Sequence, residues 1–202
     1  FWKLRGGEKL ASNYWSNGIR PDWIWGLAFP LLTEIKNAFD KTNEKFLLGI
    51  SALPGCGKST LGKWLEAASS ELNWPIKVIS LDDFYLPGKL LDKEMSDNPW
   101  GVPRGLPGSH SIELLNETID IWKTTGNLKA PQFDKALRGG RGDRSGWITA
   151  NPKVLIIEGW FLGCKSLETS KKGDFSIEKL NPILSIQEVN YRERVQQLLE
   201  EY

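Results

Sequence analysis

Residues 46–60 read FLLGISALPGCGKST, an apolar run followed by a glycine-containing turn and the tetrapeptide Gly-Lys-Ser-Thr. The apolar run is typical of a buried strand, and the residues after Gly57 are typical of a helix start. This strand–loop–helix order predicts a P-loop, in which backbone N–H groups surround the oxygens of a bound phosphate. Ala52 stands where the motif usually opens with Gly, and a turn that holds no ligand is the alternative interpretation. We expect the segment to bind a nucleotide triphosphate.

The motif gives a chemical role to two of its side chains. Lys58 is expected to reach the β- and γ-phosphates, and the hydroxyl of Ser59 is expected to be a ligand of Mg²⁺. The predicted cofactors are therefore ATP and Mg²⁺. The predicted nucleotide-binding residues are Pro54, Gly55, Cys56, Gly57, Lys58, Ser59 and Thr60.

The composition limits the classes of function. The 202 residues carry 26 basic and 25 acidic side chains, a balance that does not favour nucleic acid or an anionic membrane as a partner. The two cysteines lie far apart in the sequence, which favours a reducing, cytoplasmic setting over a disulfide scaffold. A plastid stays open as a setting, because the sequence begins with Phe1 and a transit segment can precede it.

The apolar pattern predicts alternating helices and strands around the loop. Helices are expected over 21–41, 59–73, 112–123 and the later part of 180–202, and strands over 46–52, 76–81 and 154–157. Pro30 is expected to kink or divide the first helix near Phe29. Residues 86–109 are rich in Pro and Gly and predict an irregular, substrate-binding excursion, and residues 130–147 are a polar segment rich in Arg and Gly.

Alternating strands and helices indicate a parallel sheet. We expect an α/β protein with the three-layer α/β/α arrangement of the P-loop NTPases, a mainly parallel sheet and a nucleoside monophosphate kinase-like architecture. A helical segment over 1–45 is expected to pack on a P-loop kinase domain over 46–202. Ligands of such sheets bind at the carboxyl ends of the strands. The polar residues that end three predicted strands, at Ser51, Asp82 and Glu158, are therefore expected to converge on one crevice.

Four segments together resemble a known family. The segment ISLDDFYL at 79–86 resembles the second-strand motif of the uridine kinase, pantothenate kinase and phosphoribulokinase group of P-loop kinases. Within that group, three further segments are similar to D-glycerate 3-kinase of the cyanobacterial and plant type. These are RGLPGSH at 104–110, FDK at 133–135 leading to GRGDR at 140–144, and IEGWFLG at 157–163. Ser111 stands where the family usually has Asp, and the family continues beyond the position of Tyr202, which implies a C-terminally incomplete version.

The resemblance implies an activity and a set of catalytic residues. The reaction would be ATP-dependent phosphorylation of D-glycerate to 3-phospho-D-glycerate, a step that returns glycerate from photorespiration to carbon fixation. By resemblance, Asp82 is the general base, and Glu158 contacts Mg²⁺ through water or orients the attacking group. Lys58 completes the predicted catalytic set, and Ser59, Asp82 and Glu158 form the predicted metal set. Read without the resemblance, both acids also suit turns or caps at strand ends.

A carboxylate substrate favours arginine, which binds carboxylates through two parallel hydrogen bonds. The predicted substrate-binding residues are Asp83, Tyr85, Arg104, His110, Arg141 and Arg144, with Lys135 as a weaker candidate. Solvated loop charges are the alternative for the arginines, and a structural hydrogen bond is the alternative for His110. Two other functions stay open: a P-loop kinase of another small acceptor, such as uridine or pantothenate, and a non-catalytic ATP-binding module. The sequence does not indicate an oligomeric state.

Overall fold

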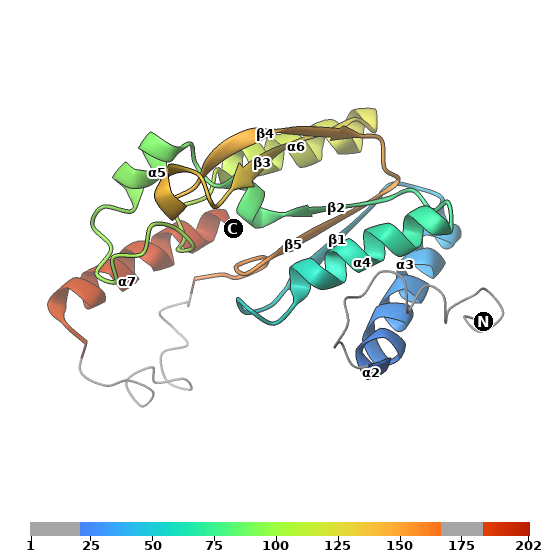
Figure 1. Ribbon diagram of the computed structural model, residues 1–202, viewed down its shortest axis with the longest axis horizontal. Coiled ribbons are helices and arrows are strands. Elements are labelled where there is room, and N and C mark those ends of the chain that lie inside the picture. Colours follow the sequence, from blue (N-terminus) through green and yellow to red (C-terminus); the bar gives the residue numbers. More distant parts are fainter. Residues whose placement is uncertain (1–20, 167–183) are drawn as a thin grey trace. The chain divides into compact units, whose positions relative to one another are not determined.

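The structure is a computed structural model of the chain, and it describes residues 21–166 and 184–202 (Figure 1). These residues form two compact units. The first unit is built from the described residues within 1–80, 118–129 and 149–160. The second is built from the described residues within 81–117, 130–148 and 161–202. The predicted boundary at residue 45 stays a prediction.

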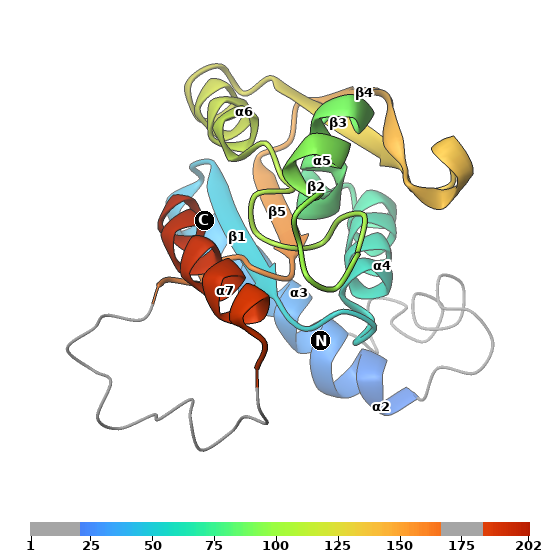
Figure 2. The same ribbon diagram turned by 90° about the vertical axis from the view of Figure 1, so that its left-hand side faces the viewer.

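A three-stranded parallel sheet forms the framework of the first unit. Strand β5 (Val154–Gly159) lies between β1 (Phe46–Ser51) and β2 (Ile76–Ser80) (Figures 1 and 2). All six residues of β5 are buried, as is usual for the central strand of a parallel sheet. The pairing register places Ile50 and Ser80 opposite Glu158 on its two sides. The three predicted strands and the predicted α/β class with a mainly parallel sheet are confirmed.

Helices α3 (Phe29–Thr42) and α4 (Lys58–Glu71) pack against this sheet in one buried cluster. Trp64 of α4 is fully buried and meets the ring of Phe29 edge to face, with ring centroids 5.2 Å apart. Burial of one large apolar side chain contributes about 1.5–3 kcal/mol. This packing fixes α4, and with it the position of the loop that leads into the helix.

Pro30 divides the first helical segment, as predicted. The segment begins with α2 (Pro21–Trp23) and the π-helix η2 (Ile24–Ala28), and α3 follows with Pro30 in its first turn. The N–H of Phe29 donates to the carbonyl of Ile24, five residues back. Because proline has no N–H and its ring crowds the preceding turn, the regular hydrogen-bond ladder widens at this point.

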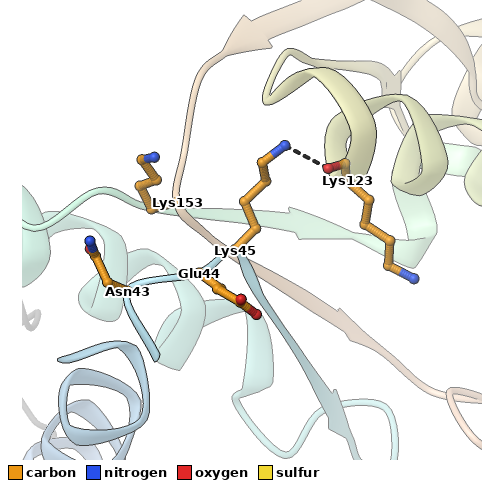
Figure 3. Close-up of a pocket in the computed structure, with 5 residues that line it drawn as sticks. All are labelled: Asn43, Glu44, Lys45, Lys123 and Lys153. Atoms are coloured by element: carbon orange, nitrogen blue, oxygen red, sulfur yellow. Dashed lines mark hydrogen bonds between the residues drawn. The ribbon is translucent and has the colours of Figure 1, made fainter. Parts of the chain in front are cut away.

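Helix α6 (Ile112–Thr125) ends in the first unit, where two side chains hold it. The indole N–H of the fully buried Trp122 donates to the carbonyl of Pro152 at 2.9 Å. The ammonium of Lys45 donates to the carbonyls of Trp122 and Lys123 at 3.2 and 2.5 Å, which caps the helix end (Figure 3). The surface pocket drawn there is lined by Asn43, Glu44, Lys45, Lys123 and Lys153. Lys45 and Lys153 precede β1 and β5, so the pocket lies at the amino ends of the strands.

The second unit contains structure that the sequence pattern did not indicate. Strands β3 (Leu128–Asp134) and β4 (Asp143–Ala150) form a two-stranded sheet, in the polar segment over 130–147 for which no strand was predicted. Neither strand has the apolar run that is typical of a buried strand, because β3 contains Pro131 and β4 is rich in polar residues. The excursion over 86–109 contains a short helix, α5 (Gly88–Glu94), and no helix or strand follows it before residue 110.

Helix α7 (Ile186–Leu198) confirms the predicted C-terminal helix, and the 3₁₀ turn η7 (Leu199–Glu201) follows it. Residues 180–183 of that prediction lie outside the described residues. Arg194 pairs with Glu94 at 3.0 Å, and the rings of Tyr191 and Trp100 meet edge to face at 5.5 Å. These contacts attach α7 to the segment 94–100. Within the described ranges, no helix has the length and apolar character needed to span a membrane.

Candidate active site

The connection between β1 and α4 has the backbone geometry of a P-loop. Gly55 and Gly57 have φ angles of 79° and 90°, in the left-handed region that favours glycine. Gly57 is the N-cap of α4. The residues from Leu53 to Cys56 are exposed, so the loop before the helix start is accessible to solvent. The positive end of the helix dipole favours an anion at this position.

Lys58 lies across the loop that it follows. Its ammonium donates to the carbonyl of Leu53 at 3.2 Å, a contact within the loop itself. An ammonium has three N–H donors, so this bond occupies one of them. The side chain therefore places a positive charge beside the glycine turn, where the motif predicts phosphate oxygens.

Ser59 and Glu158 form a direct contact beneath the start of α4. The Ser59 hydroxyl donates to Oε1 of Glu158 at 2.8 Å, and Glu158 is only 3% exposed. Gly62 allows this approach: a Cβ there would lie 2.9 Å from Cγ1 of Val78 and 4.0 Å from Cγ of Glu158. The absence of that side chain lets the first turns of α4 lie close to β2 and β5.

The Ser59–Glu158 pair fits the Mg²⁺ that the motif implies. Within residues 21–166 and 184–202, no Lys or Arg lies within ion-pair distance of Glu158. A buried carboxylate without a cation is costly, and a divalent ion would neutralise it. Hydroxyl and carboxylate oxygens are the ligands that Mg²⁺ prefers, and it commonly takes one or two from the protein and others from phosphates. The described residues contain no cluster of three His, Cys, Asp or Glu that could hold a metal ion.

Asp82 lies in the second unit, between two nitrogen groups. The ammonium of Lys135 is 2.6 Å from Oδ2 of Asp82, and Nε2 of His110 is 3.9 Å from Oδ1. Burial raises the pKa of Asp82, but His110 and Lys135 lower it by more, so the pKa lies well below its usual range. Asp82 is therefore a carboxylate at neutral pH. The neighbouring Asp83 accepts the backbone N–H of Phe133 at 3.1 Å and holds β3 in place.

Tyr85 and His110 stack beside this carboxylate. Their ring centroids are 4.4 Å apart with an interplanar angle of 20°, and their backbones form an antiparallel bridge. Burial and then the charge of Asp82 raise the pKa of Tyr85, which keeps the phenol neutral. Burial lowers the pKa of His110 although Asp82 opposes this shift, which favours a neutral imidazole. The Nδ1 atom of His110 lies 2.7 Å from the hydroxyl of Tyr202.

The three predicted arginines of the second unit contact the protein itself. Arg104 donates to the carbonyls of Gly140 and Arg141 at 2.8 and 3.0 Å, and Arg141 pairs with Asp92. Arg144 donates to the carbonyl of Tyr85 at 3.2 Å. These contacts tie the β3–β4 connection to its surroundings. A role in substrate binding stays a prediction for all three.

The structure brings some predicted residues together and adds one that the sequence did not indicate. Ser59 and Glu158 contact each other, whereas Asp82 belongs to the second unit, so the predicted metal set and the expected convergence of the strand ends stay predictions. Tyr202 was missed. It is 92 positions from His110 in the sequence, and no local motif indicates the contact.

Comparison with known proteins shows related kinases. No family model matches the sequence. An uncharacterized kinase of Schizosaccharomyces pombe is 38% identical over 135 residues, which covers 61% of this chain and 49% of the relative. The chloroplastic D-glycerate 3-kinase of Arabidopsis thaliana is 34% identical over 149 residues, which covers 67% of this chain and 33% of the relative. The chain thus spans half or less of the length of these two curated relatives.

Solved structures share the fold. The structure of the YGR205w protein aligns with a TM-score of 0.68 and 25% identity, over 86% of this chain and 62% of that chain. D-glycerate 3-kinase from Cryptococcus neoformans var. grubii aligns with a TM-score of 0.65 and 23% identity, over 88% of this chain and 66% of that chain. The chain has the α/β fold of the P-loop kinases, and its resemblance to D-glycerate 3-kinase, within the group that includes uridine kinase, is confirmed.

Proposed function

We propose that this chain carries the catalytic part of an ATP-dependent kinase that converts D-glycerate to 3-phospho-D-glycerate. The observation that carries the proposal is the buried Glu158 carboxylate, held by Ser59 at the helix start that follows the glycine loop. A turn without a ligand would gain nothing from burying this charge. The similarity to a D-glycerate 3-kinase over 67% of the chain supports the choice of acceptor.

The first unit supplies the groups for the phosphate donor. The backbone from Gly55 to Lys58 surrounds the phosphates of ATP, and the ammonium of Lys58 leaves the Leu53 carbonyl to contact the β- and γ-phosphates. Ser59 and Glu158 would hold Mg²⁺. When bound, the ion neutralises charge on the phosphate oxygens.

The second unit supplies the groups for the acceptor. Asp82 takes the proton of the C3 hydroxyl as its oxygen bonds to the γ-phosphorus, and the bond from that phosphorus to the bridging oxygen breaks to release ADP. Lys135 holds the carboxylate of Asp82 in place through its ion pair. The glycerate carboxylate binds to arginine: the contacts described above use one nitrogen each of Arg104 and Arg144, and a guanidinium has five N–H donors.

Assay of ADP release with a panel of acceptors tests this function. The panel contains D-glycerate, uridine and pantothenate, each with Mg²⁺ and ATP. We expect turnover with D-glycerate. Turnover with uridine or pantothenate and not with D-glycerate would assign the same chemistry to another acceptor. Binding of ATP without turnover of any acceptor would make the chain a nucleotide-binding module. Turnover with D-glycerate would also support the photorespiratory role, and the cytoplasmic or plastid setting, that go with the resemblance.

A further inference from the structure

We propose that His110 and Tyr202 position the hydroxyl that is phosphorylated. Tyr202 fixes the tautomer of His110, so that its Nε2–H donates to the acceptor oxygen while Asp82 accepts the proton of that hydroxyl. Tyr202 is then a positioning residue that acts through His110. This inference rests on the proposed function, because it requires an acceptor with a hydroxyl group.

The first observation is a buried polar atom without a partner. Nε2 of His110 has no hydrogen-bond partner among the described residues, although the residue is only 7% exposed. Buried polar atoms in native proteins are nearly always paired, because an unmade hydrogen bond costs free energy. The atom faces Oδ1 of Asp82, so a ligand that hydrogen-bonds both groups would satisfy it.

The separation of the two atoms suits a bridging hydroxyl. Nε2 of His110 and Oδ1 of Asp82 are 3.9 Å apart, which is too long for a direct hydrogen bond. One oxygen placed about 2.8 Å from each atom spans that gap with normal hydrogen-bond lengths. A hydroxyl can do this because it accepts one hydrogen bond and donates another. The pair therefore holds the nucleophilic oxygen and its proton at defined positions.

The contact of Tyr202 with Nδ1 of His110 fits the tautomer that this arrangement needs. A neutral imidazole carries one hydrogen, and a carboxylate oxygen offers none, so Nε2 must be the protonated nitrogen for His110 to donate toward Asp82. Nδ1 is then an acceptor, and the Tyr202 hydroxyl at 2.7 Å donates to it. The stacked ring of Tyr85 holds the imidazole plane in this orientation.

Two variants of His110 in the full chain test the contact with the acceptor. His110→Gln keeps an N–H donor near the position of Nε2, whereas His110→Leu removes it. D-Lactate has the same configuration as D-glycerate and lacks the C3 hydroxyl. By calorimetry, we expect His110→Leu to weaken binding of D-glycerate about tenfold, the loss of one hydrogen bond, and to change binding of D-lactate less than about twofold. His110→Gln should restore most of the affinity and of kcat.

Tyr202→Phe tests the positioning role, with a control on helix α7, which precedes Tyr202 in the chain. The hydroxyl of Tyr191 is also buried without a partner among the described residues, so Tyr191→Phe removes a similar group away from His110. We expect Tyr202→Phe to lower kcat about three- to tenfold with the KM for ATP unchanged. Tyr191→Phe should leave both constants unchanged.

The possible results distinguish this inference from the proposed function. Equal D-glycerate affinities of the Gln and Leu variants, or an equal loss of D-lactate binding, would show a structural histidine or a bridging water only. An unchanged kcat in Tyr202→Phe would overturn the role of Tyr202. If D-glycerate is not a substrate but another acceptor is, the proposed acceptor fails and the same variants with that acceptor decide this inference. Absence of turnover with every acceptor would overturn both.

Discussion

Glu158 is the buried acidic residue of the first unit to which the proposed function assigns Mg²⁺ binding. Its carboxylate is buried beside Ser59, and the described residues provide no Lys or Arg to balance its charge. Such a group lowers the stability of the fold unless it binds a cation. The same residue is therefore expected to reduce stability without Mg²⁺ and to support activity with it.

Glu158→Gln separates these two effects. The variant keeps the size and the hydrogen bond to Ser59 but removes the charge. We expect Mg²⁺-dependent turnover to fall about a hundredfold or more. The Tm without Mg²⁺ should stay the same or rise, because the cost of burying the charge is gone. Thermal unfolding with and without Mg²⁺ and ATP measures both effects. A variant that keeps the full Mg²⁺-dependent rise in Tm would contradict the metal assignment.

At the scale of single elements, turns and caps position the side chains of the second unit. The β3–β4 connection brings Gly142, with a φ of 81°, against the ring of Phe133. A Cβ at Gly142 would lie 2.3 Å from Cε1 of that ring, whereas a Cβ at Gly140, with a φ of 91°, would meet nothing within 4 Å. Both positions need glycine for backbone reasons, and only Gly142 also needs it for space.

Alanine substitutions at these two glycines are a matched pair. Gly140→Ala is expected to cost about 1 kcal/mol, the strain of a left-handed backbone at a residue with a side chain. Gly142→Ala adds the displacement of Phe133 and should cost about 2–4 kcal/mol in total. Urea unfolding measures the two free energies. Equal losses of unfolding free energy in the two variants would mean that the ring of Phe133 moves without lowering stability.

The start of α7 depends on a capping box. The Ser185 hydroxyl accepts the backbone N–H of Glu188, and the Glu188 carboxylate accepts the backbone N–H of Ser185 at 2.7 Å. Ser185→Ala should lower the Tm by about 2–4 °C. Ser145→Ala is the control, because its hydroxyl makes only a 3.4 Å contact with the carbonyl of Gln132. A Tm for Ser185→Ala that matches this control would show that the cap adds nothing.

At the scale of the whole molecule, the groups proposed to bind the donor and the acceptor belong to different units. The loop, Lys58, Ser59 and Glu158 lie in the first unit, and Asp82, His110 and Lys135 lie in the second. Nucleotide binding should therefore depend on the first unit alone. The proposed phosphoryl transfer would need groups of both units.

Asp82→Asn tests this division. The variant cannot accept the proton of the acceptor hydroxyl, so turnover should fall about 10²- to 10⁴-fold. Binding of Mg²⁺ and ATP, followed by calorimetry, should stay within about twofold, because none of the loop residues is changed. Unchanged turnover would remove Asp82 from the mechanism, and loss of ATP binding would show that the two units do not act separately.

The sequence by itself determined the P-loop, the three parallel strands and the position of Glu158. These features are encoded locally: apolar runs bury strands, and Gly55 and Gly57 permit a backbone that other residues resist. Only the tertiary structure decided the β3–β4 pair, the contacts of the arginines and the contact of Tyr202 with His110. Those features join polar groups that lie far apart in the sequence. Such contacts form only when the chain folds, so no local sequence pattern predicts them.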